Sequence, residues 1–404
     1  MKSDLDRLMQ DAALDALLVA GGTIHNPAMY YFTGGIHLLR GFLIKKRGEA
    51  PVLFHPSMER EEAARSGLAV RDLNDFSWNG VLHRAGGKRL AQLLASLDVR
   101  GRVAVLGRIE IGPLLACLPA LQEHRPEIEL APEFDGQSVL ARARATKSED
   151  EVERIRQTGR ATVEVVGNVA DFLTSHRAHG EVLVNQRGEV LTIGEVKRRI
   201  NLWLAMKGLD NPEGCIFSVG RDAAIPHSTG IDSAPVETGK TIIFDIFPCE
   251  ARGGYFYDFT RTWVLGQASD EILAIHQDVL EAVQLARRSI RPGVICGEVQ
   301  VAVCQAFEAR GHATLRTDAK TTSGYVHTLG HGVGLDVQEP PYTRPEDKAT
   351  AFASGMVFTI EPGLYYPERG LGVRLEDTVW LRPDGTLETL ADYPTDLVLR
   401  LPGA

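Results

Sequence analysis

The sequence has few cysteines, and none of them is spaced as a zinc-binding pair. Only five occur among 404 residues, an odd number, and no Cys-x-x-Cys pair is present. This pattern argues against a disulfide framework and is typical of reduced, mostly buried thiols in a cytosol. The cysteines are Cys117, Cys215, Cys249, Cys296 and Cys304.

Long apolar runs and concentrated positive charge are also missing. No stretch reaches the length of a membrane span, and the N-terminal segment MKSDLDRLMQDAALD lacks the apolar core of a signal peptide. The net charge is -9 and the lysines and arginines are dispersed, so no basic surface is available for nucleic acid. We therefore expect a cytoplasmic protein with neither a membrane nor a nucleic-acid partner.

What is present suits two domains of mixed helix and strand. A chain of 404 residues exceeds a typical single core, and 44% hydrophobic residues can fill two. In the first part, the runs LDALLVAG, GFLIKK, PVLFH and RVAVLG predict strands, which alternate with helical patterns such as GKRLAQLLASLD. Ser148 followed by Glu151 forms a capping box that predicts the start of a long helix. We therefore predict an α/β domain over 1–145 and an α+β domain over 146–404.

Further along, two more helices and one loop are expected. The pattern predicts a helix from about Ser269 to Ile290 and a shorter one from about Glu298 to Arg310, which Gly311 ends. The polar stretch RAHGEVLVNQRGEVLTIGE is interpreted as a surface loop or insertion.

Four carboxylates and one imidazole lie in strongly patterned segments of the second domain. The run TIIFDIFP predicts a buried strand, where the lone Asp245 is costly unless a cation faces it. The other segments place their charged residue on a strand, at a strand end or in a glycine-rich loop. The five candidates are Asp245, Asp258, His331, Glu361 and Glu376.

Any one of these acids would more often be a solvated residue on an edge strand. Four converging carboxylates are different, because two like charges about 4 Å apart repel by about 4 kcal/mol at an effective dielectric of about 20. Two divalent cations would cancel all four charges. Oxygen-rich ligation with one imidazole suits Mn²⁺, Co²⁺, Fe²⁺ or Zn²⁺, and paired metals that activate water suit hydrolysis of an acyl bond.

With these motifs in this order, the chain from about Lys147 onward resembles the pita-bread metallopeptidases, the family of methionine aminopeptidase, aminopeptidase P and prolidase. The N-terminal part resembles the creatinase/prolidase-type N-terminal domain. The resemblance implies that Asp245 chelates one metal and that Asp258 and Glu376 bridge both. It also implies that His331 and Glu361 bind the second metal, with Glu361 as the proton shuttle.

Other residues match the family by motif. His227, in GRDAAIPHSTG, corresponds to the histidine beside the scissile bond, and His327 to the one that precedes the metal histidine. Both could instead be structural histidines with satisfied hydrogen bonds. Arg374 matches the arginine of the prolidase and aminopeptidase P branch, where it would orient the site or contact substrate, unless it is a structural ion pair with Glu376 or another acid.

Two departures from the family pattern affect the site. The segment DIFPCEARGGYFYD is longer than the usual hairpin, and it carries Cys249, which is either an accessible thiol or an ordinary loop residue. Gln338 stands where proline-specific members commonly have histidine. Glutamine can donate a hydrogen bond to a substrate but cannot carry a proton.

The resemblance implies a metal-dependent exopeptidase for peptides with proline in the second position. We expect an Xaa-Pro dipeptidase that binds two divalent ions, Mn, Co or Zn, and that forms a homodimer as members of the family usually do. Aminopeptidase P on longer peptides is the main alternative. Two further alternatives are a non-peptidase enzyme on the same scaffold, either a creatinase-like amidinohydrolase or a metal-dependent lyase, and a binding protein that has lost catalysis. The amidinohydrolase and the binding protein are disfavoured, because such relatives lack metal ligands and no ligand is missing here.

The segment MYYFTGGIHLLRG has the pattern of a strand that passes into a loop, and it carries His37 and Arg40. One of these two residues is a candidate for limiting substrate length or binding the substrate carboxylate from a partner subunit, against the alternative of an ordinary surface loop.

Overall fold

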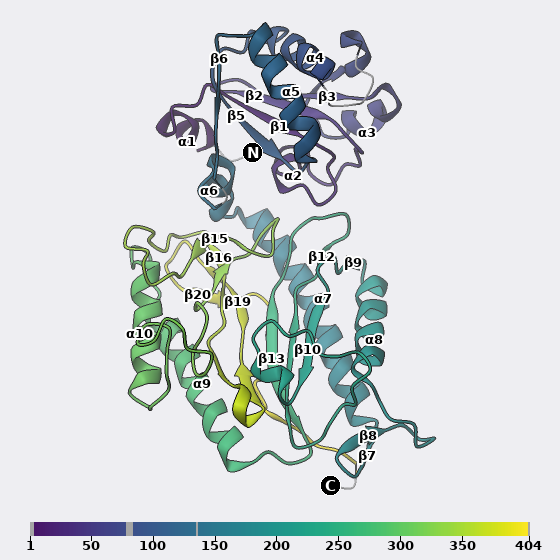
Figure 1. The fold of residues 1–404 in the computed structure, drawn as a ribbon, viewed down its shortest axis with the longest axis vertical. Coiled ribbons are helices and arrows are strands. Elements are labelled where there is room, and N and C mark those ends of the chain that lie inside the picture. The colour runs from purple at the N-terminus through teal and green to yellow at the C-terminus, as the bar shows by residue number, and fades with distance from the viewer. Residues whose placement is uncertain (1–3, 78–83, 135, 403–404) are drawn as a thin grey trace. The chain divides into compact units, whose positions relative to one another are not determined.

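The computed structural model describes residues 4–77, 84–134 and 136–402, which divide into two compact units. The first comprises Met1–Arg144 with Arg252–Gly254, and the second comprises Ala145–Ala251 with Tyr255–Ala404. Both units combine helices with strands (Figure 1). We propose residues 1–145 and 146–404 as the two domains.

The first unit is built around one six-stranded sheet with the order β4-β3-β2-β1-β5-β6. Its central strand β1 pairs antiparallel with β2 and parallel with β5. The four runs predicted as strands are confirmed as β1, β2, β3 and β5. The strands are β1 (Ala16–Ala20), β2 (Phe42–Lys46), β3 (Val52–His55), β4 (Ala69–Asp72), β5 (Gly101–Gly107) and β6 (Ile128–Ala131).

Helices cover both faces of this sheet because its central strand is apolar on both sides. Leu17 and Val19 of β1 pack in one core with α1, α2 and α6, whereas Leu18 packs in a second core with α4 and α5. Side chains that alternate along a strand point to opposite faces, so a continuous apolar run implies two covered faces. The helices are α1 (Leu5–Asp11), α2 (Pro27–Thr33), α3 (Arg60–Ala64), α4 (Arg84–Ala95), α5 (Ile111–His124) and α6 (Val139–Ala145).

The second unit contains two larger sheets. One is four-stranded with the order β10-β11-β13-β21, and the other is five-stranded with the order β15-β14-β16-β19-β20. A bridge between Thr260 and Glu376 brings β13 next to the start of β19. The strands are β7 (Arg177–His179), β8 (Val182–Val184), β9 (Leu209–Asp210), β10 (Cys215–Val219), β11 (Thr241–Ile246), β12 (Cys249–Glu250), β13 (Phe259–Leu265), β14 (His331–Gly332), β15 (Glu339–Tyr342), β16 (Val357–Ile360), β17 (Gly363–Tyr366), β18 (Leu371–Arg374), β19 (Asp377–Leu381), β20 (Leu387–Thr389) and β21 (Val398–Leu399).

Three helices of this unit begin close to where the sequence predicts. Ser148 and Glu151 form the predicted capping box at the start of α7 (Glu149–Thr174). The next two predicted helices are confirmed as α9 (Asp270–Ser289) and α10 (Cys296–Glu308), which lie side by side and share a core with β16, β18 and β19. Among the described residues, no helix has both the length and the apolar character that a membrane crossing requires.

The stretch RAHGEVLVNQRGEVLTIGE was wrongly predicted as a loop. It forms the hairpin of β7 and β8, and its end starts α8 (Ile193–Met206), whose N-cap Thr192 accepts a hydrogen bond from the backbone N–H of Glu195. The helix is stabilised by an apolar face that spans the end of the stretch and the residues after it. The buried residues of that face include Ile193, Val196, Ile200 and Leu204.

One smaller expectation also fails, and one open alternative is decided. The residues Met29–Phe32 belong to helix α2 rather than to a strand, because Asn26 caps that helix and Pro27 begins it. Of the two alternatives for Cys249, the structure excludes the accessible thiol, because the residue is fully buried on β12, which pairs with β9. His37 is half-buried and Arg40 exposed in the segment after α2, and their suggested role stays a prediction.

Candidate active site and metal centre

One cavity of about 580 Å³ in the second unit is lined by nine residues that the sequence nominates for ligation, catalysis or substrate binding, and His37 and Arg40 of the first unit are not among them. Segments that are far apart in the chain therefore converge on a single hollow. Its volume is in the range typical of small-molecule sites. The nominated residues are Asp245, Asp258, His331, Glu361, Glu376, His227, His327, Gln338 and Arg374.

Strand register brings three of the acids together. Asp245 on β11 lies opposite Thr260 on β13, and Thr260 is in turn bridged to Glu376. The Thr260 hydroxyl donates to Glu376 Oε2 at 2.6 Å. Asp258 directly precedes β13, two residues before Thr260, so the pleat places it on the same face.

His331 and Glu361 meet through the neighbouring strand β16. The Thr359 hydroxyl accepts from the backbone N–H of His331 at 3.1 Å and donates to Glu361 Oε1 at 3.0 Å. His331 Nε2 lies 3.3 Å from the same Glu361 oxygen and 3.7 Å from Asp258 Oδ2. The approach requires glycine at 330, since a Cβ there would lie 2.1 Å from the Thr359 carbonyl oxygen.

The donor set fits divalent cations. Single ligand atoms of Asp258, His331 and Glu376 lie within 4.8 Å of one another. Asp245 Oδ1 and Asp258 Oδ1 are buried, and neither has a hydrogen-bond partner among the described residues. A buried carboxylate oxygen without a donor is costly, and a cation removes that cost. Oxygen ligands with one imidazole suit the metals expected from the sequence.

The carboxylates behave as a group that needs such cations. Burial raises the pKa of Asp258 and of Glu376 well above their ordinary values, and each is raised further by neighbouring acids. Burial raises the pKa of Glu361 to about 8. Protons therefore take the place of cations when the site is empty, and they make the carboxylates neutral.

These shifts predict opposite pH responses with and without metal. In the metal-free protein, the pKa of Glu361 in the folded state is about 8, above the ordinary value of 4.5. The contribution of protonated Glu361 to the stability of the fold is therefore complete below about pH 4.5 and is lost as the pH rises through 8. Metal binding requires deprotonated ligands, so the metal-loaded protein gains stability over the same range. Melting curves from pH 7.0 to 8.5, with chelator and with Mn²⁺, measure both slopes above the range in which the lowered pKa values of buried histidines such as His327 contribute. A chelated protein that melts higher at pH 8.5 than at pH 7.0 would contradict the expected direction.

His327 is held in one tautomer. Its Nδ1 lies 2.8 Å from the Thr328 carbonyl oxygen, which only accepts, so Nδ1 carries the proton. Its Nε2 then accepts from the Tyr365 hydroxyl at 3.0 Å. Burial, followed by the charge of Arg374, lowers the pKa of His327 to about 3. His327 is thus a neutral imidazole with both nitrogens engaged.

Arg374 donates to four groups of the protein. Its Nη2 contacts Asp245 Oδ2 at 2.6 Å, and its Nη1 contacts the Tyr365 hydroxyl at 2.6 Å. Its remaining donors reach the Thr260 hydroxyl and the Pro226 carbonyl oxygen, both at 3.3 Å. The buried guanidinium therefore forms an ion pair with Asp245, as the structural alternative expected, and it is arranged to orient that carboxylate. Contact of Arg374 with substrate stays a prediction.

His227 and Gln338 occupy the accessible part of the cavity lining. Both side chains are exposed, in contrast to the buried acids. Their polar atoms are therefore open to a bound molecule.

Three residues that line the cavity or contact its lining were not identified from the sequence. Tyr365 joins His327 to Arg374, and it lies in a strand whose composition is that of an ordinary core. Arg344 and Glu213 line the cavity and are exposed. Arg344 is separated from Gln338 and Tyr342 by even numbers of residues, so the alternation of side chains along a strand could have placed it on the same face as Gln338. The sequence of the turn before β10 contains no pattern that identifies Glu213 as a cavity residue.

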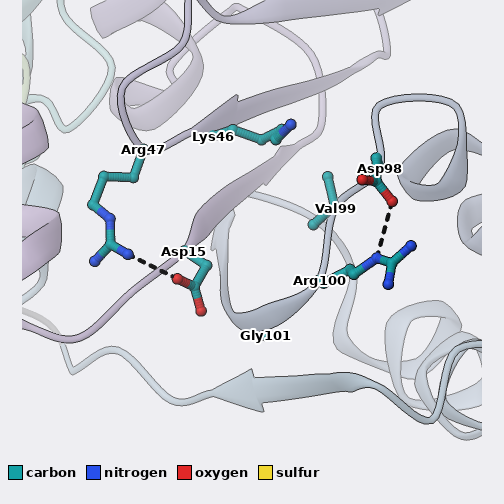
Figure 2. A pocket seen from close by; sticks show the side chains of 7 residues that line it. All are labelled: Asp15, Lys46, Arg47, Asp98, Val99, Arg100 and Gly101. Carbon is teal, nitrogen blue, oxygen red and sulfur yellow. Dashed lines mark hydrogen bonds and ion pairs between the residues drawn. The ribbon is translucent and has the colours of Figure 1, made fainter.

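The first unit has a cavity of its own, of about 360 Å³, shown in Figure 2. Arg47 pairs with Asp15 and Arg100 pairs with Asp98, each at 3.0 Å. Lys46 pairs with a glutamate at 2.6 Å. These surface ion pairs satisfy the charged groups of the lining and leave no group arranged for catalysis.

Comparison with known families agrees with this geometry. The profile of metallopeptidase family M24 matches residues 153–383, and that of the creatinase/prolidase N-terminal domain matches residues 2–132. The family implies divalent metal ions. The resemblance and the two-domain fold class predicted from the sequence, a pita-bread domain after a creatinase/prolidase-type domain, are confirmed.

Individual relatives extend over nearly the whole chain. An Xaa-Pro dipeptidase of Pyrococcus horikoshii is 26% identical over 94% of this chain and 93% of its own. A probable dipeptidase, PepE, of Mycobacterium tuberculosis is 28% identical over 88% of this chain and 84% of its own. The crystal structure of the Pyrococcus horikoshii prolidase superposes with a TM-score of 0.74 at 24% identity, covering 98% of both chains. That of an X-Pro aminopeptidase from Thermotoga maritima gives 0.75 at 21%, covering 97% and 99%.

Proposed function

Since the chain belongs to metallopeptidase family M24, we propose that it hydrolyses the peptide bond before proline in Xaa-Pro dipeptides, with two divalent ions. The observation that carries the proposal is the convergence of four carboxylates and one imidazole in one cavity, with an exposed histidine and an exposed arginine in its lining. Relatives named as Xaa-Pro dipeptidases over most of the chain support the substrate.

We assign the metal ligands as the family resemblance implies. Asp245 would hold one ion, Asp258 and Glu376 both, and His331 and Glu361 the other, with Mn²⁺, Co²⁺ or Zn²⁺ as the candidates. When bound, such ions activate water and polarise a carbonyl group.

The chain's own residues supply the proton transfers and the orientation. Glu361 would take the proton of the attacking water and pass it to the proline nitrogen, which leaves as an amine. The exposed His227 would donate to the substrate carbonyl oxygen as negative charge develops there. Gln338 would orient the peptide by hydrogen bonding, and His327 would keep Tyr365 and Arg374 in place.

Dipeptide preference requires a cation that meets the free carboxylate of proline, and we assign this role to Arg344. Its guanidinium lies over the Tyr342 ring, 4.8 Å from the centroid, and is exposed at the cavity. Within the described ranges, no carboxylate lies at ion-pair distance from it. A longer peptide carries an amide at this point, so it would leave the charge unpaired.

Leu-Pro should therefore be cleaved with a higher kcat/KM than Leu-Pro-Gly, and Arg344→Gln should remove most of the difference. A charge-assisted hydrogen bond worth about 1.5–3 kcal/mol corresponds to roughly tenfold or more in kcat/KM. Lys348→Gln removes an exposed charge from the same loop and serves as the control, with no expected change. If the wild type cleaves both peptides equally, or the longer one better, the enzyme is an aminopeptidase P with the same metal site.

The remaining alternatives have less support. A creatinase-like amidinohydrolase that works without metal, or an inactive binding protein, would not need the complete ligand set that lines this cavity. A metal-dependent lyase would need it, and cleavage of Leu-Pro distinguishes the proposed peptidase from such an enzyme. We also propose a homodimer, from the family resemblance. A cytoplasmic location is part of the proposal, and it is supported by five cysteines that are all buried and form no disulfide among the described residues.

A further inference from the structure

We propose that Glu213 binds a positively charged amine on the amino-terminal side of the substrate. The inference rests on the proposed function and adds a determinant of selectivity for the first residue. Glu213 lines the cavity and its side chain is exposed there.

A rigid turn presents this carboxylate. The backbone N–H of Gly214 donates to the Asn211 carbonyl oxygen at 3.3 Å, and Gly214 has a φ of +77°. Pro212 fixes the second position of this four-residue turn, which is where proline is favoured. The Asn211 side chain donates to Asn201 Oδ1 of α8 at 2.8 Å. The turn is therefore anchored to the neighbouring helix, and Glu213 has few backbone conformations to lose on binding.

The sheet topology places Glu213 and Arg344 on different sides of the candidate ligands. Glu213 directly precedes Gly214 and β10, an outer strand of the four-stranded sheet, and Ile216 of β10 lies opposite Asp245. Arg344 follows β15, an outer strand of the five-stranded sheet. The strands that position the five candidate ligands lie inward of these two. A peptide with its carboxylate at Arg344 therefore directs its amino end toward Glu213.

The charge of Glu213 is available for this contact. The other four acids of the lining are the candidate metal ligands, which divalent ions would neutralise. In the part of the chain that the structure describes, no Lys or Arg forms an ion pair with Glu213. An ammonium group is the natural partner of such a carboxylate, and an acidic first residue would be repelled.

Two parts of a substrate could supply the ammonium group: the α-amino group, or the side chain of a lysine in the first position. Four substrates separate them. Leu-Pro is compared with 4-methylpentanoyl-Pro, which lacks the α-amino group, and Lys-Pro is compared with norleucyl-Pro, which lacks the side-chain amine.

The experiment measures kcat/KM of these substrates for the wild type, for Glu213→Gln and for Glu181→Gln, an exposed control that does not line the cavity. Glu213→Gln is expected to lower kcat/KM about tenfold, through KM, for substrates that carry the relevant amine. A loss for Leu-Pro but not for 4-methylpentanoyl-Pro identifies the α-amino group. A loss confined to Lys-Pro identifies the side chain.

Equal values for wild type and Glu213→Gln, or equal losses on all four substrates, would overturn the inference while leaving the proposed function intact. A wild-type enzyme that is folded and metal-loaded but cleaves none of the four would overturn both. Unchanged melting temperatures of the two variants establish that the comparison is made between folded proteins.

Discussion

Glu361→Gln is expected to lower kcat for Leu-Pro by about a thousandfold or more while the protein stays folded. General acid–base catalysis alone contributes about 10²–10⁴-fold, and the change also removes a negatively charged ligand. Glu361 is suited to proton transfer because it is mostly buried, with 16% of its side chain exposed, and its Oε1 is fixed by Thr359 at 3.0 Å.

Glu368→Gln provides the matched control. This glutamate is exposed, lies in the same part of the chain and does not line the cavity, so its replacement should leave kcat unchanged. Steady-state kinetics with saturating Mn²⁺ distinguish the two variants. Retention of more than about a tenth of wild-type kcat by Glu361→Gln would rule out this residue as the proton carrier.

Lys147→Met is expected to cost about 3–5 kcal/mol of unfolding free energy, because it leaves a buried carboxylate without its counter-charge. Lys147 Nζ contacts Glu339 Oε1 at 2.6 Å, and both side chains are only 1% exposed. The carboxylate also occupies the space that a Cβ at Gly334 would need, since the two atoms would lie 2.2 Å apart. The pair therefore holds the segment that carries His331 and Gln338, so metal affinity should fall as well.

A double variant tests whether the lost stability comes from the unbalanced charge of Glu339 or from the changed shape of the side chain at position 147. Lys147→Met combined with Glu339→Gln removes both charges and should recover much of the lost stability, whereas Lys320→Met, at an exposed lysine, should cost little. Urea denaturation of the metal-free proteins measures the stabilities, and Mn²⁺ titration measures the affinities. If Lys147→Met had the wild-type free energy of unfolding and the wild-type Mn²⁺ affinity, the ion pair would contribute neither to stability nor to the position of the metal ligands.

The candidate ligands could be predicted from the sequence because each lies in a short segment whose pattern is informative by itself. Asp245, for example, is an acid in a strand of β-branched and aromatic residues, and the structure buries it on β11. The starts of helices could also be predicted, because the residues that cap a helix are close in the sequence, as the capping box of Ser148 and Glu151 illustrates.

The partners of these residues could not be predicted, because they come from distant parts of the chain. Lys147 and Glu339 are 192 positions apart, and Arg374 meets Asp245 across 129 positions. No local pattern distinguishes Tyr365, which links Arg374 to His327, from its neighbour Tyr366. Helix α8 was missed for a different reason, since its apolar face begins within a polar stretch and continues beyond it.

The proposed chemistry depends on two divalent ions in each chain, and the number of ions can be counted. Protein stripped with chelator and then saturated with Mn²⁺ is measured by native mass spectrometry, alongside turnover of Leu-Pro by the same samples. We predict two ions per chain at full turnover, and neither bound ions nor turnover in the stripped protein. Full turnover with one ion or none per chain would contradict this prediction.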